Sequence, residues 1–416
     1  MKRTIKSIVK LMSFGFIGLA LLSCSKNETV PVNQDKAIGF NTYTGRAVSK
    51  ADGSLIDKGT TTLLNGKQFV VFAYNTKTAD WTGAVNNVFM KAVPVKYEGT
   101  TGDAADKIDA SKYTYSPLRY WPNDEANNKL SFFAYYPYQG AGITPPQDGN
   151  GWGSYGFAAQ TDPKNMIDFC LSEVAPNMTY NNTNSGQKGV VNMKFYHTLT
   201  MVKFQIKTDK DYNAYTTGDD TQDEPQVDAA NSTVITLKSI SLAGVKTTGT
   251  LTPVAVPTTE NPAKAKWTAQ AGATALNVFP ASETGKALST TAVFLPTGTE
   301  KDDAYLMVPQ ELGDDVIATV TYTVKTGSDA EVTNTAKVQL NLAKIVPAQG
   351  QPTEGIAEWK MNQNIVYTFV VGLQPIQFIA EVADWDPVTT ATDFVIPTTP
   401  ADNSGSGSGS GSGEGA

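Results

Sequence analysis

The sequence predicts an all-β fold built from two β-sandwich domains. Short segments that alternate apolar and polar positions, or run apolar with β-branched residues, recur along the chain. Turn-forming clusters of Gly, Pro, Asn and Asp separate them, and no long stretch after residue 23 keeps the 3.6-residue apolar period of a helix. The 416 residues, 40% apolar and 18% charged, can bury a core. They are too many for one sandwich of about 100 residues, so two are expected.

The first 24 residues predict export and lipid attachment. A basic start, formed by Lys2, Arg3, Lys6 and Lys10, precedes an apolar stretch over residues 11–22 that is shorter than the roughly 20 residues of a membrane-spanning helix. The stretch ends in Leu21-Leu22-Ser23-Cys24, with a small residue before the first cysteine. This pattern predicts a lipoprotein signal peptide over residues 1–23 and lipid on the Cys24 thiol. The alternative is an ordinary signal peptide followed by an unrelated cysteine.

Charge, cysteine and histidine content exclude several classes of function. Removal of residues 1–23 takes away four positive charges and changes the net charge from −7 to −11, which disfavours binding to nucleic acid. If Cys24 carries lipid, Cys170 has no disulfide partner, and we interpret it as a buried apolar residue rather than a nucleophile. His197 is the single histidine, so His and Cys alone cannot form a zinc centre. No cofactor, metal site or catalytic residue is predicted.

The expected elements follow one another as short strands. Residues 25–36 are polar and predict a tether from the membrane, and residues 38–42 have the period-2 pattern of a short strand. Further strands are expected, in chain order, at residues 68–74, 130–136, 191–195, 202–206, 234–237, 316–324, 338–342 and 365–371.

Polar and turn-rich segments predict the domain organisation. The stretch 180–187 has turn formers and no apolar residue after Tyr180, which places a domain boundary near residue 188. The acidic segment 218–224 is interpreted as a hairpin insertion, and the Ser-Gly alternation of residues 404–413 as a flexible tail. The predicted parts are a signal peptide (1–23), a tether and pro-segment (24–46), an N-terminal sandwich (47–188), a C-terminal sandwich with donor strands (189–400) and a tail (401–416).

Several sequence blocks carry a family resemblance. In chain order they are Leu21 to Cys24, Ile38-Gly39-Phe40 leading to Thr44-Gly45-Arg46-Ala47, Tyr120-Trp121-Pro122 with residues 130–137, residues 195–204, residues 305–310, residues 359–367 and Ala383-Asp384-Trp385. Together and in this order they resemble the fimbrillin family, the subunits of type V pili. The resemblance implies two transthyretin-like β-sandwich domains in tandem and a structural subunit rather than an enzyme. It also implies an outer-membrane lipoprotein precursor that becomes part of a cell-surface fimbrium and supports adhesion.

The resemblance also places processing and assembly on particular residues. An arginine-specific protease would cut between Arg46 and Ala47, remove residues 24–46 with the strand around Phe40, and leave a hydrophobic groove. A C-terminal strand of another subunit can fill such a groove by β-augmentation. Two segments alternate suitably, with apolar residues Ile376, Phe378, Ala380 and Val382 in the first and Phe394 and Ile396 in the second. The expected partners are other fimbrial subunits, the outer membrane through the lipid, and a host or glycan receptor.

These predictions have alternatives. In the alternative interpretation, Arg46 is only a surface arginine and no cleavage site. The two C-terminal segments are then the last strands of their own domain and not donors. The aromatic block over residues 113–138 either packs in the core or forms a platform for stacking sugars. The second functional hypothesis is therefore an outer-membrane lipoprotein that binds glycan through Trp121 and Trp152 without polymerising.

Overall fold

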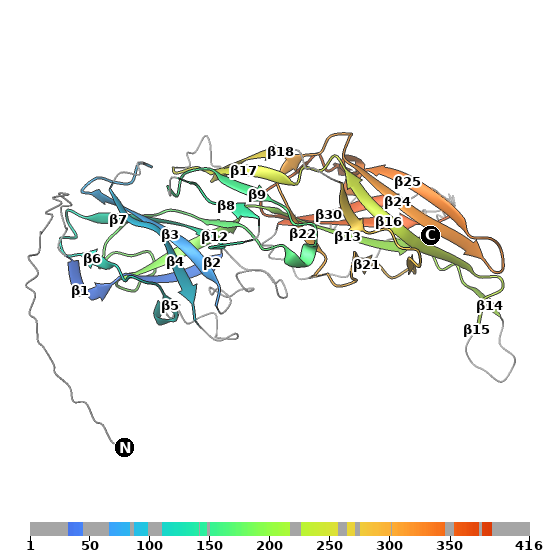
Figure 1. The fold of residues 1–416 in the computed structure, drawn as a ribbon, viewed down its shortest axis with the longest axis horizontal. Helices are drawn as coiled ribbons and strands as arrows, with labels where there is room; N and C mark the ends of the chain where they lie inside the picture. The colour runs from blue at the N-terminus through green and yellow to red at the C-terminus, as the bar shows by residue number, and fades with distance from the viewer. Residues whose placement is uncertain are drawn as a thin grey trace, which may run out of the picture.

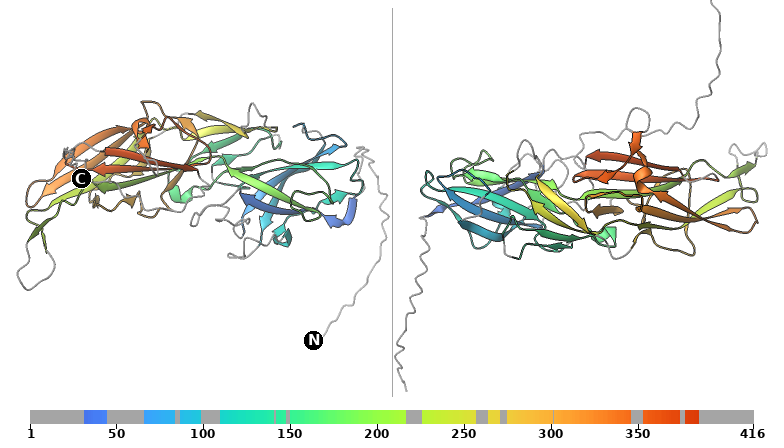
Figure 2. Two further views of the ribbon diagram at one scale, coloured as in Figure 1. Left: turned by 180° about the vertical axis from the view of Figure 1, so that it is seen from behind. Right: turned by 90° about the horizontal axis from the view of Figure 1, so that it is seen from above.

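The computed structural model of the chain is built almost entirely from β-strands, arranged as two halves in line (Figures 1 and 2). Among the residues it describes, no helix has the length and apolar character needed to cross a membrane. The structure describes residues 32–44, 66–83, 87–98, 110–140, 142–147, 150–216, 226–256, 264–270, 275–300, 302–345, 353–373 and 377–384.

An eight-stranded sheet forms the N-terminal half. Across the sheet the strands are β2 (Gly39–Thr44), β12 (Val190–His197), β10 (Cys170–Ser172), β7 (Lys129–Tyr136), β3 (Gln68–Lys77), β4 (Val88–Tyr97) and β5 (Tyr113–Thr114), and β11 (Ala175–Met178) also pairs with β7.

Two smaller sheets accompany the eight-stranded sheet. The first pairs β1 (Val32–Ala37) with β6 (Tyr120–Pro122). The second has the order β18 (Ala265–Gln270), β17 (Thr248–Pro253), β9 (Tyr155–Ala158) and β8 (Ile143–Thr144). Because β9 precedes and β17 follows the N-terminal sheet strand β12, this four-stranded sheet combines segments from both halves of the sequence.

Two larger sheets form the C-terminal half. One has the order β21 (Val293–Phe294), β13 (Thr200–Thr208), β29 (Gln363–Val371), β30 (Gln377–Asp384), β26 (Lys344–Ile345) and β27 (Thr353–Gly355), with β22 (Ala304–Met307) also on β13. The other has the order β19 (Leu276–Phe279), β16 (Thr233–Ala243), β24 (Ile317–Thr326) and β25 (Val332–Gln339), with β20 (Lys286–Ala287) also on β16. Their facing side chains form one core, which is the arrangement of a β-sandwich.

The remaining described elements are short. They are the hairpin of β14 (Ala214–Thr216) and β15 (Gln226–Asp228), the pair β23 (Gln310–Glu311) and β28 (Glu358–Trp359), and the 3-10 helices η1 (Ala110–Lys112), η2 (Pro163–Asn165) and η3 (Leu340–Leu342).

Both faces of the N-terminal sheet are buried. Along β3, Phe69 and Val71 belong to one apolar core, whereas Val70 and Phe72 belong to another on the opposite face. The four-stranded sheet covers the second face, to which it contributes Phe157 among others. Burial on both faces explains why residues 68–74 form an unbroken apolar run instead of an alternating one.

The predicted all-β sandwich class is confirmed, and one predicted strand is partly wrong. β25 ends at Gln339, and η3 replaces the strand expected over residues 340–342. Leu340 is buried and its N–H donates to the carbonyl of Val316, whereas Leu342 is 63% exposed. The apolar alternation over residues 338–342 therefore reflects the 3-10 helix η3, which buries the side chain of Leu340 and leaves that of Leu342 exposed. The hairpin interpretation of residues 218–224 is supported by the flanking strands β14 and β15.

The strand pairing does not follow the predicted domain boundary at residue 188. The polar segment 180–187 lies between β11 and β12, and β12 still pairs with β2 and β10 in the N-terminal sheet. The chain enters the C-terminal sheet only at β13. The division into two domains stays a prediction, and the pairing favours a boundary between His197 and Thr200.

Candidate assembly strands and a buried polar cluster

β2 is the edge strand of the N-terminal sheet and contains Phe40, which belongs to the segment 24–46 expected to be removed by proteolysis. It runs parallel to β12, and its residue pairs extend from Gly39 with Val190 to Thr44 with Phe195. Among the described residues, no strand pairs with its outer edge. β2 is therefore bound to the sheet along one side only.

Phe40 anchors β2 in the N-terminal core. Its side chain is fully buried, and its ring makes edge-to-face contacts with Tyr115, Phe132 and Phe69 at centroid distances of 5.5, 6.0 and 6.3 Å. Ile38, just before β2, is also buried. Loss of this segment would expose the rings that Phe40 now covers.

Polar contacts fix the position of β2 and the residue before it. The hydroxyl groups of Thr42 and Tyr113 are hydrogen-bonded at 2.7 Å, and the Tyr115 hydroxyl donates to the carbonyl of Ile38 at 2.9 Å. Burial raises the pKa of Tyr115 to about 12, so this hydroxyl keeps its proton at neutral pH. The Ile38 N–H donates to the carbonyl of Arg119. The segment is thus held by specific contacts as well as by burial.

β30 contains most of the first predicted donor segment and lies within the C-terminal sheet. It pairs antiparallel with β29 along its whole length and parallel with β26 on its other side. Ala380 is fully buried in the C-terminal core, and Val382 packs against that core. In this structure β30 therefore completes the sheet of its own chain, and it does not meet β2 (Figure 1).

Cys24, Arg46, Ala47, Ile376, Phe394 and Ile396 lie outside the described residues, and Phe378 is placed only as a residue of β30.

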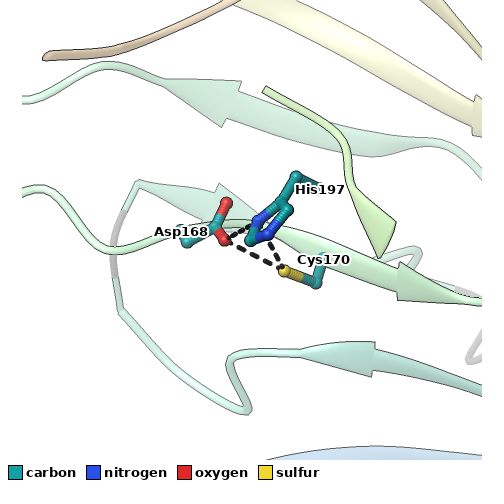
Figure 3. A group of neighbouring side chains, drawn as sticks. All are labelled: Asp168, Cys170 and His197. Carbon is teal, nitrogen blue, oxygen red and sulfur yellow. Dashed lines mark hydrogen bonds and ion pairs between the residues drawn. The ribbon is translucent and has the colours of Figure 1, made fainter. Parts of the chain in front are cut away.

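Three polar side chains meet inside the N-terminal half at the end of β12 (Figure 3). Cys170 begins β10 and His197 ends β12, directly opposite it, while Asp168 precedes Cys170 by two residues. Residues two apart in an extended chain project to the same side, so Asp168 and Cys170 both reach His197. All three are buried, with 1%, 0% and 5% of their surface exposed for Asp168, Cys170 and His197.

The contacts within this cluster centre on one carboxylate oxygen. Asp168 Oδ2 forms a short contact with His197 Nδ1 and accepts a hydrogen bond from Cys170 Sγ at 3.1 Å. Cys170 Sγ lies 3.7 Å from His197 Nδ1. Asp168 Oδ1 is buried without a hydrogen-bond partner. Because Asp168 and Cys170 contact the same imidazole nitrogen, the histidine does not link an acid to a nucleophile as in a catalytic triad.

An aromatic pocket of about 380 Å³ lies beside β7, β12 and the segment after β17. Trp81, Phe133, Trp152 and Tyr196 contribute to its lining, and the rings of Phe133 and Trp152 are 4.1 Å apart. Trp121, in contrast, is fully buried, and its Nε1 donates to the carbonyl of Gly189 at 3.0 Å. The interpretation of Trp121 as a sugar-binding side chain is therefore wrong, because its ring packs in the core.

A comparison of the sequence with models of known protein families shows to which family the chain belongs. The family model described as fimbrillin-like matches residues 57–385, which is most of the chain. The chain belongs to the fimbrillin-like family. One curated relative is named a fimbrium subunit, and the prediction of a structural protein rather than an enzyme agrees with this family.

Two relatives of this fimbrillin-like chain illustrate the similarity. Fimbrium subunit Fim1C of Phocaeicola vulgatus is 29% identical over 221 residues, which cover 50% of this chain and 52% of the relative. The chain thus matches about half the length of this curated relative. The crystal structure of a fimbrial protein from Bacteroides vulgatus has a TM-score of 0.53 at 18% identity and covers 84% of this chain and 99% of its own. This second likeness concerns the fold.

The fimbrillin-like chain contains one polar site that the sequence did not predict. Cys170 is buried, as expected, and so is His197, but their contact with Asp168 depends on the pairing of β10 with β12. The Asp-x-Cys spacing is visible in the sequence. The sequence does not show the strand pairing that brings His197, 27 residues after Cys170, to the same point.

We expect Cys170 to be unreactive toward thiol reagents in the folded protein. Burial raises the pKa of its thiol, and the nearby Asp168 carboxylate raises it further, so the nucleophilic thiolate is scarce and shielded. Mixing with an aromatic disulfide reagent should label less than about a tenth of Cys170 in the time that labels it fully in denaturant. Equal labelling rates in the two conditions would show that the cluster is open to solvent.

Proposed function

We propose that the protein is a structural subunit of a cell-surface fimbria and that it polymerises by exchange of β-strands. The observation that carries the proposal is the position of β2, an N-terminal edge strand that pairs on one side only within the described part of the chain, yet is anchored by Phe40 in the core. A strand of this kind can leave without unthreading the sheet, and its departure opens an apolar groove along β12. Membership of the fimbrillin-like family supports this role.

The proposed processing begins with an exported precursor that carries lipid on Cys24 and is held at the outer membrane. Cleavage between Arg46 and Ala47 would detach the lipid together with β1 and β2. The rings of Phe69 and Phe132, which now contact Phe40, would then line an unfilled groove. Exposure of such apolar surface favours the binding of a new strand.

The proposed donor is a C-terminal segment of another subunit. Main-chain hydrogen bonds to β12 would place it, and alternate apolar side chains would enter the core. Large apolar residues contribute about 1.5 to 3 kcal/mol each when fully buried, so several give on the order of 10 kcal/mol before ordering entropy is subtracted. We favour the segment with Phe394 and Ile396, because β30 is already paired on both sides.

Limited proteolysis tests the proposal. Incubation of the purified chain with an arginine-specific protease is expected to remove the residues up to Arg46 and to yield ladders that resist mild SDS. The matched control is Arg46→Ala, which should stay untrimmed and monomeric under the same conditions. If the correctly trimmed protein stays monomeric at every concentration, the assembly proposal fails.

The aromatic pocket supports a second candidate, a surface lipoprotein that binds glycan. Trp152 lines the pocket beside Phe133, and aromatic rings of this kind can stack on sugars. Glycan-array binding that is lost in Trp152→Ala, in a protein that never forms ladders, would favour this candidate over the first.

A further inference from the structure

The Asp168–Cys170–His197 cluster has an uncompensated polar atom. Asp168 is 1% exposed, and its Oδ1 has no hydrogen-bond partner. Burial of a carboxylate oxygen without a partner is unfavourable, and such atoms in folded proteins are usually matched by a donor, a water molecule or an ion. The cluster therefore lacks one positive or donating group on the side of Oδ1.

The three side chains also offer the atoms that zinc prefers. A carboxylate oxygen, a thiol sulfur and an imidazole nitrogen are its usual protein ligands. The sulfur lies 3.1 Å from Asp168 Oδ2 and 3.7 Å from His197 Nδ1. A zinc ion about 2.0 Å from oxygen and nitrogen and about 2.3 Å from sulfur holds its ligand atoms roughly 3 to 4 Å apart. Both sulfur distances fit this range, and only the Asp168–His197 contact must widen.

We propose that Asp168, Cys170 and His197 form a binding site for a divalent transition-metal ion of the zinc type. Asp168 Oδ2, Cys170 Sγ and His197 Nδ1 are the three ligands, and Asp168 Oδ1 or a water molecule completes the coordination. The exclusion of a centre made from His and Cys alone still holds, because an aspartate supplies the additional ligand.

The charges and protons of this site balance. The thiol releases its proton when its sulfur binds the ion, and His197 binds through Nδ1 in the neutral form. The carboxylate and the thiolate then offset the two positive charges, so the buried site carries no net charge. A neutral site is the form least penalised by removal from water.

The position of the site gives it a structural role. It connects the start of β10 with the end of β12, and two residues separate the end of β12 from the start of β13. A bound ion would fix this junction between the two halves in a chain whose Cys170 has no disulfide. A metal link between neighbouring strands would thus stabilise the fold in the way that a disulfide does in many exported proteins.

Metal reconstitution tests the site. The mature chain is unfolded with reductant and chelator, refolded with Zn²⁺ or Co²⁺, and freed of loose metal by gel filtration. We expect about one zinc ion per wild-type chain and at least a tenfold lower content in Cys170→Ser and Asp168→Asn. Glu173→Gln is the matched control, because this nearby carboxylate pairs with Lys194 and Lys264 outside the cluster, and it should retain the metal.

The cobalt form gives a second readout, with Cys170→Ser as its control because Cys24 is also a thiol in a chain without lipid. Wild-type protein refolded with Co²⁺ is expected to show the charge-transfer absorption of a cobalt–thiolate bond. Zinc at about 100 times its Kd should also raise the Tm by about 5 °C in the wild type and not in Cys170→Ser. Absence of the cobalt–thiolate absorption, or equal zinc content in wild type and Cys170→Ser, would overturn the proposal.

Discussion

Replacement of Phe40 by alanine is expected to lower the free energy of unfolding of the untrimmed chain by about 3 to 5 kcal/mol. The ring is fully buried and packs against three other aromatic rings in the N-terminal core. The smaller side chain leaves a cavity that a sheet with two packed faces cannot close easily. Urea unfolding followed by tryptophan fluorescence measures the change.

Lys36→Ala is the matched control for this variant. Lys36 belongs to β1, in the same segment that trimming would remove, and its ammonium group lies 3.8 Å from Glu125 and over the Tyr180 ring. Its side chain is partly exposed, so its loss should cost less than about 1 kcal/mol. A Phe40→Ala variant no less stable than Lys36→Ala would show that β2 contributes little to the core.

The second large effect is expected at the C-terminal donor. The double variant Phe394→Asp with Ile396→Asp should reduce SDS-resistant ladders of trimmed protein at least tenfold, because two carboxylates would have to enter an apolar groove. The untrimmed monomer should keep its circular dichroism spectrum and its Tm. Densitometry of the ladders over a concentration series measures the loss.

Two further variants identify the donor. Ile376→Asp with Phe378→Asp changes the segment at β30, and Val332→Asp changes an exposed edge residue of β25 that has no role in the proposal. Ladders that survive the change at Phe394 and Ile396 but disappear with the change at Ile376 and Phe378, in a variant whose untrimmed monomer keeps the wild-type Tm, would assign the donor to the first segment. Val332→Asp should leave the ladders unchanged.

The strands could be predicted from the sequence wherever the run of apolar residues was long and continuous. β3 and β7 are apolar on both faces, so their runs of residues were evident without knowledge of their neighbours. η3 was missed because the alternation of apolar residues over 338–342 does not distinguish a strand from a turn that buries Leu340. The polar loop predicts a boundary near residue 188, but the pairing of β12 with β2 joins segments far apart in the sequence and has no local sequence pattern.

The candidate sites were predictable to different degrees. The burial of Ile38 and Phe40 was expected from their alternation and is confirmed. The cluster of Asp168, Cys170 and His197 was not predicted, because it requires the pairing of two strands far apart in the sequence. The sequence does not show whether Trp121 or Trp152 lies in the core, and only the packing separates the buried Trp121 from Trp152, which lines a pocket.

The parallel pairing of β2 with β12 has a consequence for the shape of any polymer. A substitute strand that repeats the hydrogen bonds of β2 must run in the same direction as β12, so every joint has the same orientation. A filament assembled in the proposed way would be polar and would have two chemically different ends, one with an unfilled groove along β12 and one with an unused C-terminal segment. Growth and termination can then be controlled separately at each end, and a subunit without a free donor would act as a stop.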